Sequence, residues 1–143
     1  MTVLLVDDEP SDLDAARTAL EKAGYLVFAV DSYESAIQIF QQHPNGIDIA
    51  VLDVSLPGKN GVDLYQDLLT RNPNLKALFV SGHVGSEVIR FYGLRATDRY
   101  FLKKPFEPAG LIARVREIIQ SPEQLGMEDF KTAPHETRTA NGA

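Results

Sequence analysis

The 143-residue sequence contains no cysteine, and its basic residues are fewer than its acidic ones. Without cysteine the chain has neither a disulfide framework nor a thiolate metal site. Its 14 lysine and arginine residues stand against 20 aspartate and glutamate residues, which gives a net charge of −6 at pH 7. Because nucleic acids and anionic membranes are bound through clustered lysine and arginine, we expect the protein to bind neither directly.

Long hydrophobic runs are also missing. The longest run covers only a handful of residues, whereas a membrane helix needs about 20 apolar residues. Met1 leads straight into a short aliphatic run, without a basic or signal-like segment. We therefore expect a cytoplasmic protein, and its length and hydrophobic content of 44% fit a single globular domain.

The sequence does have a regular alternation of short aliphatic runs and amphipathic stretches over residues 2–120. The runs are solidly apolar, which predicts five β-strands covered on both faces. These predicted strands are Val3–Val6, Leu26–Val30, Ile47–Leu52, Ala77–Ser81 and Tyr100–Leu102.

The amphipathic stretches between the strands predict five helices. We place them from Pro10 to just before Gly24, and at about Tyr33–Gln42 with Ser32 as N-cap, Val62–Thr70, Ser86–Leu94 and Pro108–Ile119. The fourth helix has poor intrinsic propensity, so we expect it to be the most mobile one.

Alternating strands and helices of this kind predict a doubly wound α/β fold, with a five-stranded parallel sheet flanked by five helices. Residues 1–120 form one domain in this interpretation. Residues 121–143 are polar or small over most of their length and show no apolar period. We therefore expect them to form a largely disordered C-terminal tail.

Acidic residues accumulate where the first predicted strand ends. Val3–Val6 run directly into Asp7, Asp8 and Glu9. Like charges this close repel one another. The sequence therefore suggests that a cation binds here.

Other polar side chains follow the remaining strands at the same edge of the predicted sheet, where ligands of such folds bind. Asp53 follows the third strand, Ser81 ends the fourth and Lys104 follows the fifth. Taken singly, each is more often a cap, a turn residue or a surface residue. Taken together with the acidic pair, they predict a site for Mg²⁺ and an anionic group, because oxygen ligands suit a hard cation.

Four motifs, "LLVDDEP", "VLDVSLPGKNG", "LFVSG" and "FLKKPF", together resemble the receiver domain of bacterial two-component response regulators. The resemblance covers about residues 2–120 and implies a flavodoxin-like sheet with strand order 2-1-3-4-5. It also implies phosphorylation of an aspartate. Residues 88–108 are similar to receivers fused to the C-terminus of hybrid sensor kinases.

The resemblance assigns the acidic residues roles in phosphoryl transfer. Asp53 matches the phosphoacceptor. Asp8 matches a direct Mg²⁺ ligand, Asp7 an acid that acts through water, and Ser55 the residue whose backbone carbonyl completes the protein ligands.

The resemblance also assigns a lysine and two switch residues. Lys104 matches the phosphate-binding lysine, in contrast to its neighbour Lys103, and a cis peptide is implied before Pro105. Ser81 matches the switch hydroxyl and Phe101 the aromatic switch position. The role of His83 stays open.

The implied partners are proteins. A histidine kinase or histidine phosphotransfer protein would supply the phosphoryl group. The output would be a downstream protein target or a fused domain outside this chain, and a homodimer through the fourth helix, fifth strand and last helix is a further expectation. We expect no enzymatic activity beyond self-phosphorylation and autodephosphorylation.

Three other functions fit the sequence less well. A phosphatase of the haloacid dehalogenase class would need a second acid two residues after its nucleophile, where this chain has Ser55. A flavodoxin-like FMN carrier would suffer repulsion between Asp7, Asp8 and the FMN phosphate. A receiver-like module that is never phosphorylated usually lacks an acidic residue or the lysine, and this sequence has all of them.

Overall fold

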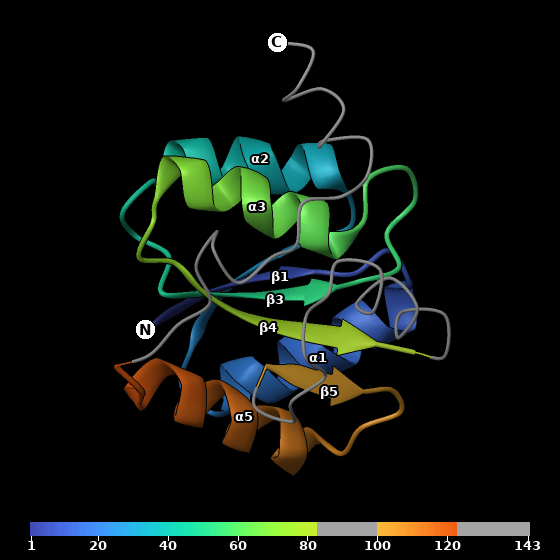
Figure 1. Ribbon diagram of the computed structural model, residues 1–143. Helices are drawn as coiled ribbons and strands as arrows, with labels where there is room; N and C mark the ends of the chain where they lie inside the picture. The colour runs from blue at the N-terminus through green and yellow to red at the C-terminus, as the bar shows by residue number, and fades with distance from the viewer. Residues whose placement is uncertain (83–99, 123–143) are drawn as a thin grey trace, which may run out of the picture.

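The computed structural model describes residues 1–82 and 100–122. A five-stranded parallel sheet lies at its centre, with strand order β2-β1-β3-β4-β5 (Figure 1). The strands are β1 (Thr2–Val6), β2 (Leu26–Val30), β3 (Ile49–Asp53), β4 (Lys76–Ser81) and β5 (Phe101–Lys103). This order confirms the predicted doubly wound fold.

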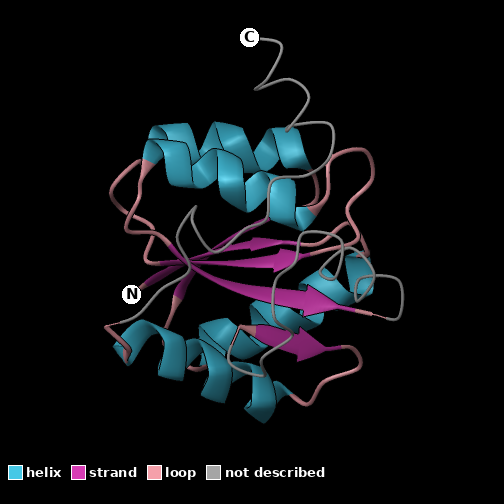
Figure 2. Cartoon of the chain, in the orientation of Figure 1, coloured by secondary structure: helices cyan, strands magenta, loops and turns pink. Residues whose placement is uncertain are grey.

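Four helices flank the sheet in the described part of the chain: α1 (Pro10–Lys22), α2 (Tyr33–Gln42), α3 (Gly61–Arg71) and α5 (Pro108–Gln120). Helices α2 and α3 cover one face, and α1 and α5 cover the other (Figures 1 and 2). The predicted fourth helix and the predicted tail beyond residue 122 lie outside the described residues. None of the described helices has the length and apolar character that a membrane crossing requires.

Two hydrophobic clusters form the core, one on each face of the sheet. The central strand β3 is buried at all five positions, as predicted for a strand covered on both faces. The prediction was wrong for β2, because β2 is an edge strand. Its first residue, Leu26, is 62% exposed.

The element ends follow local chemistry. The Ser32 hydroxyl accepts a hydrogen bond from the Ser35 backbone N–H and caps α2, as predicted. Gly24, just after α1, has φ +98°, a conformation that favours glycine. Strand β3 begins two residues later than predicted. Ile47 is buried in the core although it precedes the strand, so its apolar character reports burial and not strand pairing.

The parallel register brings the strand ends to one edge of the sheet. Val6 of β1 pairs with Leu52 of β3, and Ser81 of β4 pairs with Lys103 of β5. The residues that end or follow these strands therefore meet at this edge, although the sequence separates them by up to 97 positions.

Candidate functional site

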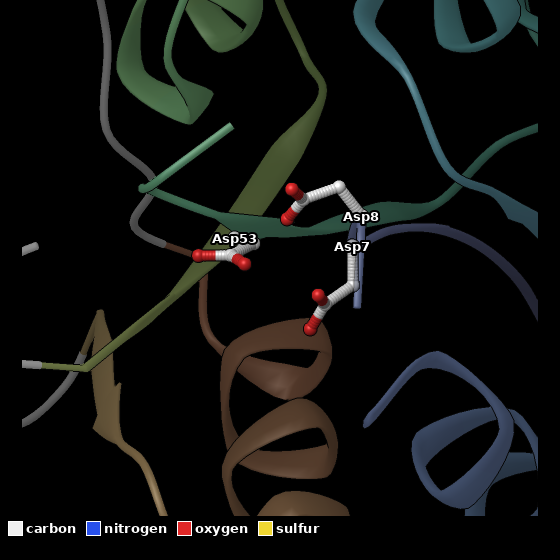
Figure 3. Close-up of side chains that lie close together, drawn as sticks. All are labelled: Asp7, Asp8 and Asp53. Atoms are coloured by element: carbon white, nitrogen blue, oxygen red, sulfur yellow. The ribbon is translucent and has the colours of Figure 1, made fainter. Parts of the chain in front are cut away.

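Three carboxylates meet at the carboxyl edge of the sheet. Asp7 and Asp8 follow β1, and Asp53 is the last residue of β3. Each has a carboxylate oxygen within 4.8 Å of the others. Figure 3 shows the side chains of Asp7 and Asp8 diverging from consecutive positions, with Asp53 beside them. Asp7 and Asp53 are buried, whereas Asp8 is exposed.

Lys104 joins this cluster and forms three ion pairs. Its Nζ lies 2.8 Å from Asp7 Oδ2, 3.0 Å from Asp12 Oδ2 and 3.2 Å from Asp53 Oδ2. An ammonium group has three protons to donate, so these carboxylates use its full capacity. The lysine side chain is only 18% exposed, which reduces the screening of these charges by water.

Burial and charge shift the protonation equilibria of the site in opposite directions. Burial raises the pKa of Asp7 to about 6, and the hydrogen bonds from Lys104 and from the Glu9 backbone oppose that rise. Burial lowers the pKa of Lys104, but its hydrogen bonds to Asp7 and Asp12 and the charge of Asp53 outweigh burial and raise it. Lys104 is therefore a permanent cation at neutral pH.

The phosphoacceptor candidate Asp53 is held by its own loop and by α3. Its Oδ1 accepts a hydrogen bond of 2.9 Å from the backbone N–H of Ser55. The Gly61 N–H donates to the Val54 carbonyl at 3.1 Å, which brings the start of α3 against the end of β3. Ser55 thus lies beside the site, and the role of its carbonyl as a metal ligand stays a prediction.

Glu9 does not belong to the cluster, although it directly follows the acidic pair. It is the N-cap residue of α1, and its carboxylate accepts hydrogen bonds from the backbone N–H and the hydroxyl of Ser11. These bonds lower the pKa of Glu9. Two of the three consecutive carboxylates thus lie in the cluster, and the third stabilises the helix that follows.

The two lysines before Pro105 differ as predicted. Lys104 points into the cluster, while Lys103 is exposed. The predicted cis peptide between Lys104 and Pro105 is confirmed. The Lys104 backbone N–H donates to the Ser81 carbonyl at 2.8 Å, so the buried Ser81 is joined to the lysine through the main chain.

The aromatic switch candidate Phe101 begins β5 and is half-buried. Its ring stacks on Phe79 of β4 with centroids 5.6 Å apart, and Phe79 in turn packs edge-on against Tyr65 of α3 at 5.7 Å. The Phe101 carbonyl accepts a 2.7 Å hydrogen bond from Arg114 Nη1 of α5. Phe101 therefore packs against the core cluster on the α3 face of the sheet, and its carbonyl is hydrogen-bonded to α5 on the other face. His83 lies outside the described residues.

Asp12 is the site residue that the sequence interpretation missed. It lies in the first turn of α1, and its partner Lys104 is 92 positions away. Together with Ala15, Pro105 and Phe106, these two residues line an open pocket of about 370 Å³. The available signal was the predicted start of the helix at Pro10, which places a first-turn carboxylate near the end of β1.

The cluster has the donor set of a hard cation. All candidate ligands are oxygen atoms, two of the carboxylates are buried, and the third is open to solvent. Mg²⁺ prefers oxygen ligands and keeps several of its waters. The residues present therefore fit this ion.

Comparison with known proteins gives a consistent result. The family model described as "Response regulator receiver domain" matches residues 3–116. The chain is 34% identical over 120 residues to the sensor kinase CckA of Brucella abortus (83% of this chain, 12% of the relative). It is 29% identical over 136 residues to the response regulator SaeR of Staphylococcus aureus (90% of this chain, 58% of the relative).

The fold comparison agrees with the sequence comparison. A response regulator receiver protein from Sinorhizobium medicae superposes with a TM-score of 0.74 at 31% identity, covering 86% of this chain and 97% of that one. The chain thus spans about an eighth of the length of CckA and somewhat over half of that of SaeR, but nearly all of the receiver structure from Sinorhizobium medicae. The chain belongs to the response regulator receiver domain family.

Proposed function

We propose that the protein accepts a phosphoryl group on Asp53 and acts as the receiver of a two-component signalling system. One observation carries the proposal. Asp53 lies beside a pair of acids that fits a hard cation and beside the ammonium of Lys104. A nucleophilic carboxylate placed between two positive partners is what transfer of a phosphoryl anion requires.

The chemistry is a displacement at phosphorus. An Asp53 carboxylate oxygen forms the new O–P bond while the N–P bond of a phosphohistidine donor breaks, and the departing imidazole nitrogen keeps the electron pair. Carboxylate and phosphoryl group repel each other, so the step depends on nearby positive charge. Lys104 supplies part of it, 3.2 Å from Asp53 Oδ2.

Mg²⁺ is the proposed cofactor. Asp8 and Asp53 would bind it directly, Asp7 through a water molecule, and Ser55 through its backbone carbonyl. When bound, it supplies charge that screens the oxygens of the transferred group.

Signalling would use the other residues at this edge. The Ser81 hydroxyl would donate a hydrogen bond to a phosphoryl oxygen, and the nearby aromatic Phe101 would change position with it. Because the Phe101 carbonyl accepts a hydrogen bond from Arg114 of α5, the altered surface would include β5 and α5. A downstream protein, a fused output domain or a second copy of the chain would bind there.

The proposed phosphodonor is a histidine kinase or a histidine phosphotransfer protein. The relatives support this general setting, because their names are those of a sensor kinase and a response regulator. Such partners would place the chain in the cytoplasm. Beyond self-phosphorylation and autodephosphorylation, we propose no enzymatic activity.

Intact mass measurement after incubation with acetyl phosphate tests the proposal. The wild type should gain the mass of one phosphoryl group with Mg²⁺ and lose this gain in EDTA. Asp53→Ala should gain nothing under either condition, while Asp63→Ala, which changes the capping box of α3, should still be modified. Modification of Asp53→Ala would place the acceptor elsewhere, and an unmodified wild type would favour a receiver-like module that only binds partners.

A further inference from the structure

Asp12 binds the ammonium of Lys104 from outside the metal cluster. The Asp12 Oδ2–Lys104 Nζ distance of 3.0 Å is shorter than the 3.2 Å between Lys104 and Asp53. Asp12 belongs to α1, whereas the carboxylates of the cluster extend from the ends of β1 and β3. It is therefore the one partner of Lys104 among these three that has no place in the proposed metal site.

The two ends of this ion pair are fixed by different parts of the fold. Asp12 lies in the first turn of a 13-residue helix capped by Glu9. Lys104 follows β5, and its backbone N–H is bonded to the Ser81 carbonyl. The lysine side chain therefore spans from the β5 edge to α1, where Asp12 is one of the three carboxylates that accept from its ammonium group.

We infer that Asp12 is a positioning residue for Lys104 in phosphoryl transfer, an inference that rests on the proposed function of Asp53. When a cation occupies the cluster, the Asp7 and Asp53 oxygens have a second positive partner. Asp12 does not belong to that cluster, so its hydrogen bond to Lys104 keeps the ammonium at the entrance to Asp53. Without this hydrogen bond, the flexible lysine side chain adopts more conformations. Bringing its ammonium group to the position needed for phosphoryl transfer then costs more conformational entropy.

If Asp12 instead competes with the phosphoryl group for Lys104, its removal should change the phosphorylation rate in the opposite direction. A carboxylate near the phosphoryl site also repels the incoming anion and competes with it for Lys104. If that repulsion were dominant, removing Asp12 would accelerate phosphorylation. The direction of the rate change therefore decides between positioning and competition.

The test measures the rate of phosphorylation by acetyl phosphate at saturating Mg²⁺ in wild type, Asp12→Ala, Asp12→Asn, Lys104→Ala and the double variant. Asp12→Ala should be slower by roughly threefold to tenfold, the range expected for residues coupled by one hydrogen bond. Asp12→Asn should recover part of the loss, because its amide oxygen still accepts a hydrogen bond. The double variant should be no slower than Lys104→Ala alone.

Asp14→Asn is the matched control, because Asp14 lies on the same helix but pairs with Arg17. Its rate should equal that of wild type. An unchanged or faster Asp12→Ala, or a double variant whose losses multiply, would overturn the inference. A wild type that is not phosphorylated at all would instead reject the proposed function.

A second measurement is independent of phosphorylation. NMR of the lysine ammonium groups reports how quickly their protons exchange with water. In the full chain with Mg²⁺, the Lys104 protons should exchange more slowly in wild type and Asp14→Asn than in Asp12→Ala. Equal exchange in all three proteins would show that Asp12 does not hold the ammonium, whatever the phosphorylation rates are.

Discussion

A Cβ atom on Gly61 would lie 2.3 Å from the backbone carbonyl oxygen of Asp53 and 2.9 Å from its carbonyl carbon. No side chain fits there, because both atoms belong to the main chain at the end of a central strand. The absence of a side chain therefore lets α3 begin directly against the phosphoacceptor candidate. Glycine at this position fixes the distance between the helix and the site.

We predict that Gly61→Ala destabilises the protein by about 1–3 kcal/mol, the usual range for overpacking. Gly110→Ala is the matched control, since a Cβ there meets nothing within 4 Å and the residue lies in α5. It should stabilise the protein by about 0.5–1 kcal/mol, because alanine favours the helix. Urea unfolding measures both, and equal effects would show that the backbone adjusts at Gly61.

The second prediction concerns the two adjacent lysines. Lys104→Ala should lower the free energy of unfolding in EDTA by about 1–3 kcal/mol, the usual cost of leaving a buried polar group without its partner, because it leaves the buried carboxylates of Asp7 and Asp53 without their cation. Lys103→Ala should change it by less than about 0.5 kcal/mol, since Lys103 is exposed. The first variant should also be modified far more slowly by acetyl phosphate. Equal losses of stability and of phosphorylation rate in both variants would show that Lys104 is not the functional lysine.

The third prediction separates the roles of consecutive acids. At a Mg²⁺ concentration about ten times its dissociation constant, the wild type should gain about 1.4 kcal/mol of stability by mass action. Asp8→Ala should lose this gain. Glu9→Gln should keep it, because the Glu9 side chain caps α1 and a glutamine oxygen still accepts from Ser11. Thermal unfolding with Mg²⁺ and with EDTA measures the gain in stability. If Glu9→Gln also loses this gain, Glu9 belongs to the metal site.

The difference between Glu9 and Asp12 shows where sequence interpretation reaches its limit. Hydrophobic runs predict the five strands because burial leaves a local signal in the sequence, whereas the strand order 2-1-3-4-5 is implied by the resemblance to receiver domains. Motif order likewise placed Asp7, Asp53 and Lys104 at one edge. Whether an acid caps its own helix or reaches a lysine 92 positions away depends on side-chain direction, which the residue type alone does not encode.

The start of β3 and the burial of β2 differ from the prediction for a related reason. Apolar character predicts that Ile47 belongs to the third strand, yet Ile47 is buried before the strand begins at Ile49. The apolar run that begins at Leu26 predicts a strand with the observed bounds, but β2 lies at the edge of the sheet and is not covered on both faces. Apolar character reports burial in the first case and strand propensity in the second, and only the three-dimensional packing separates the two.

The fourth prediction follows from the raised pKa of Asp7. Its value of about 6 exceeds the unfolded value of 3.8, mainly because burial disfavours the charged form. Between about pH 4 and pH 6 the native state therefore binds more protons than the unfolded state. The free energy of unfolding should consequently fall as the pH rises through this window, with the full penalty present above the folded pKa.

Comparison with Asp7→Asn isolates this effect, because asparagine does not titrate. On acidification from pH 7 to pH 4 in EDTA, the wild type should gain about 2 kcal/mol relative to the variant, at 1.36 kcal/mol per pKa unit. The pKa of Glu9 is lowered, so its stabilising contribution is lost at lower pH as Glu9 is protonated. This loss is common to both proteins and cancels in the difference.

Mg²⁺ should flatten the difference curve, since the ion favours the ionised form of Asp7 and so lowers its pKa. Denaturant unfolding of both proteins at several pH values, in EDTA and in excess Mg²⁺, gives the curve. A wild type that loses stability relative to Asp7→Asn on acidification in EDTA would contradict the prediction. It would mean that the ion pair with Lys104, at 2.8 Å, outweighs the burial of the carboxylate, and that the site is balanced for the lysine rather than for an added cation.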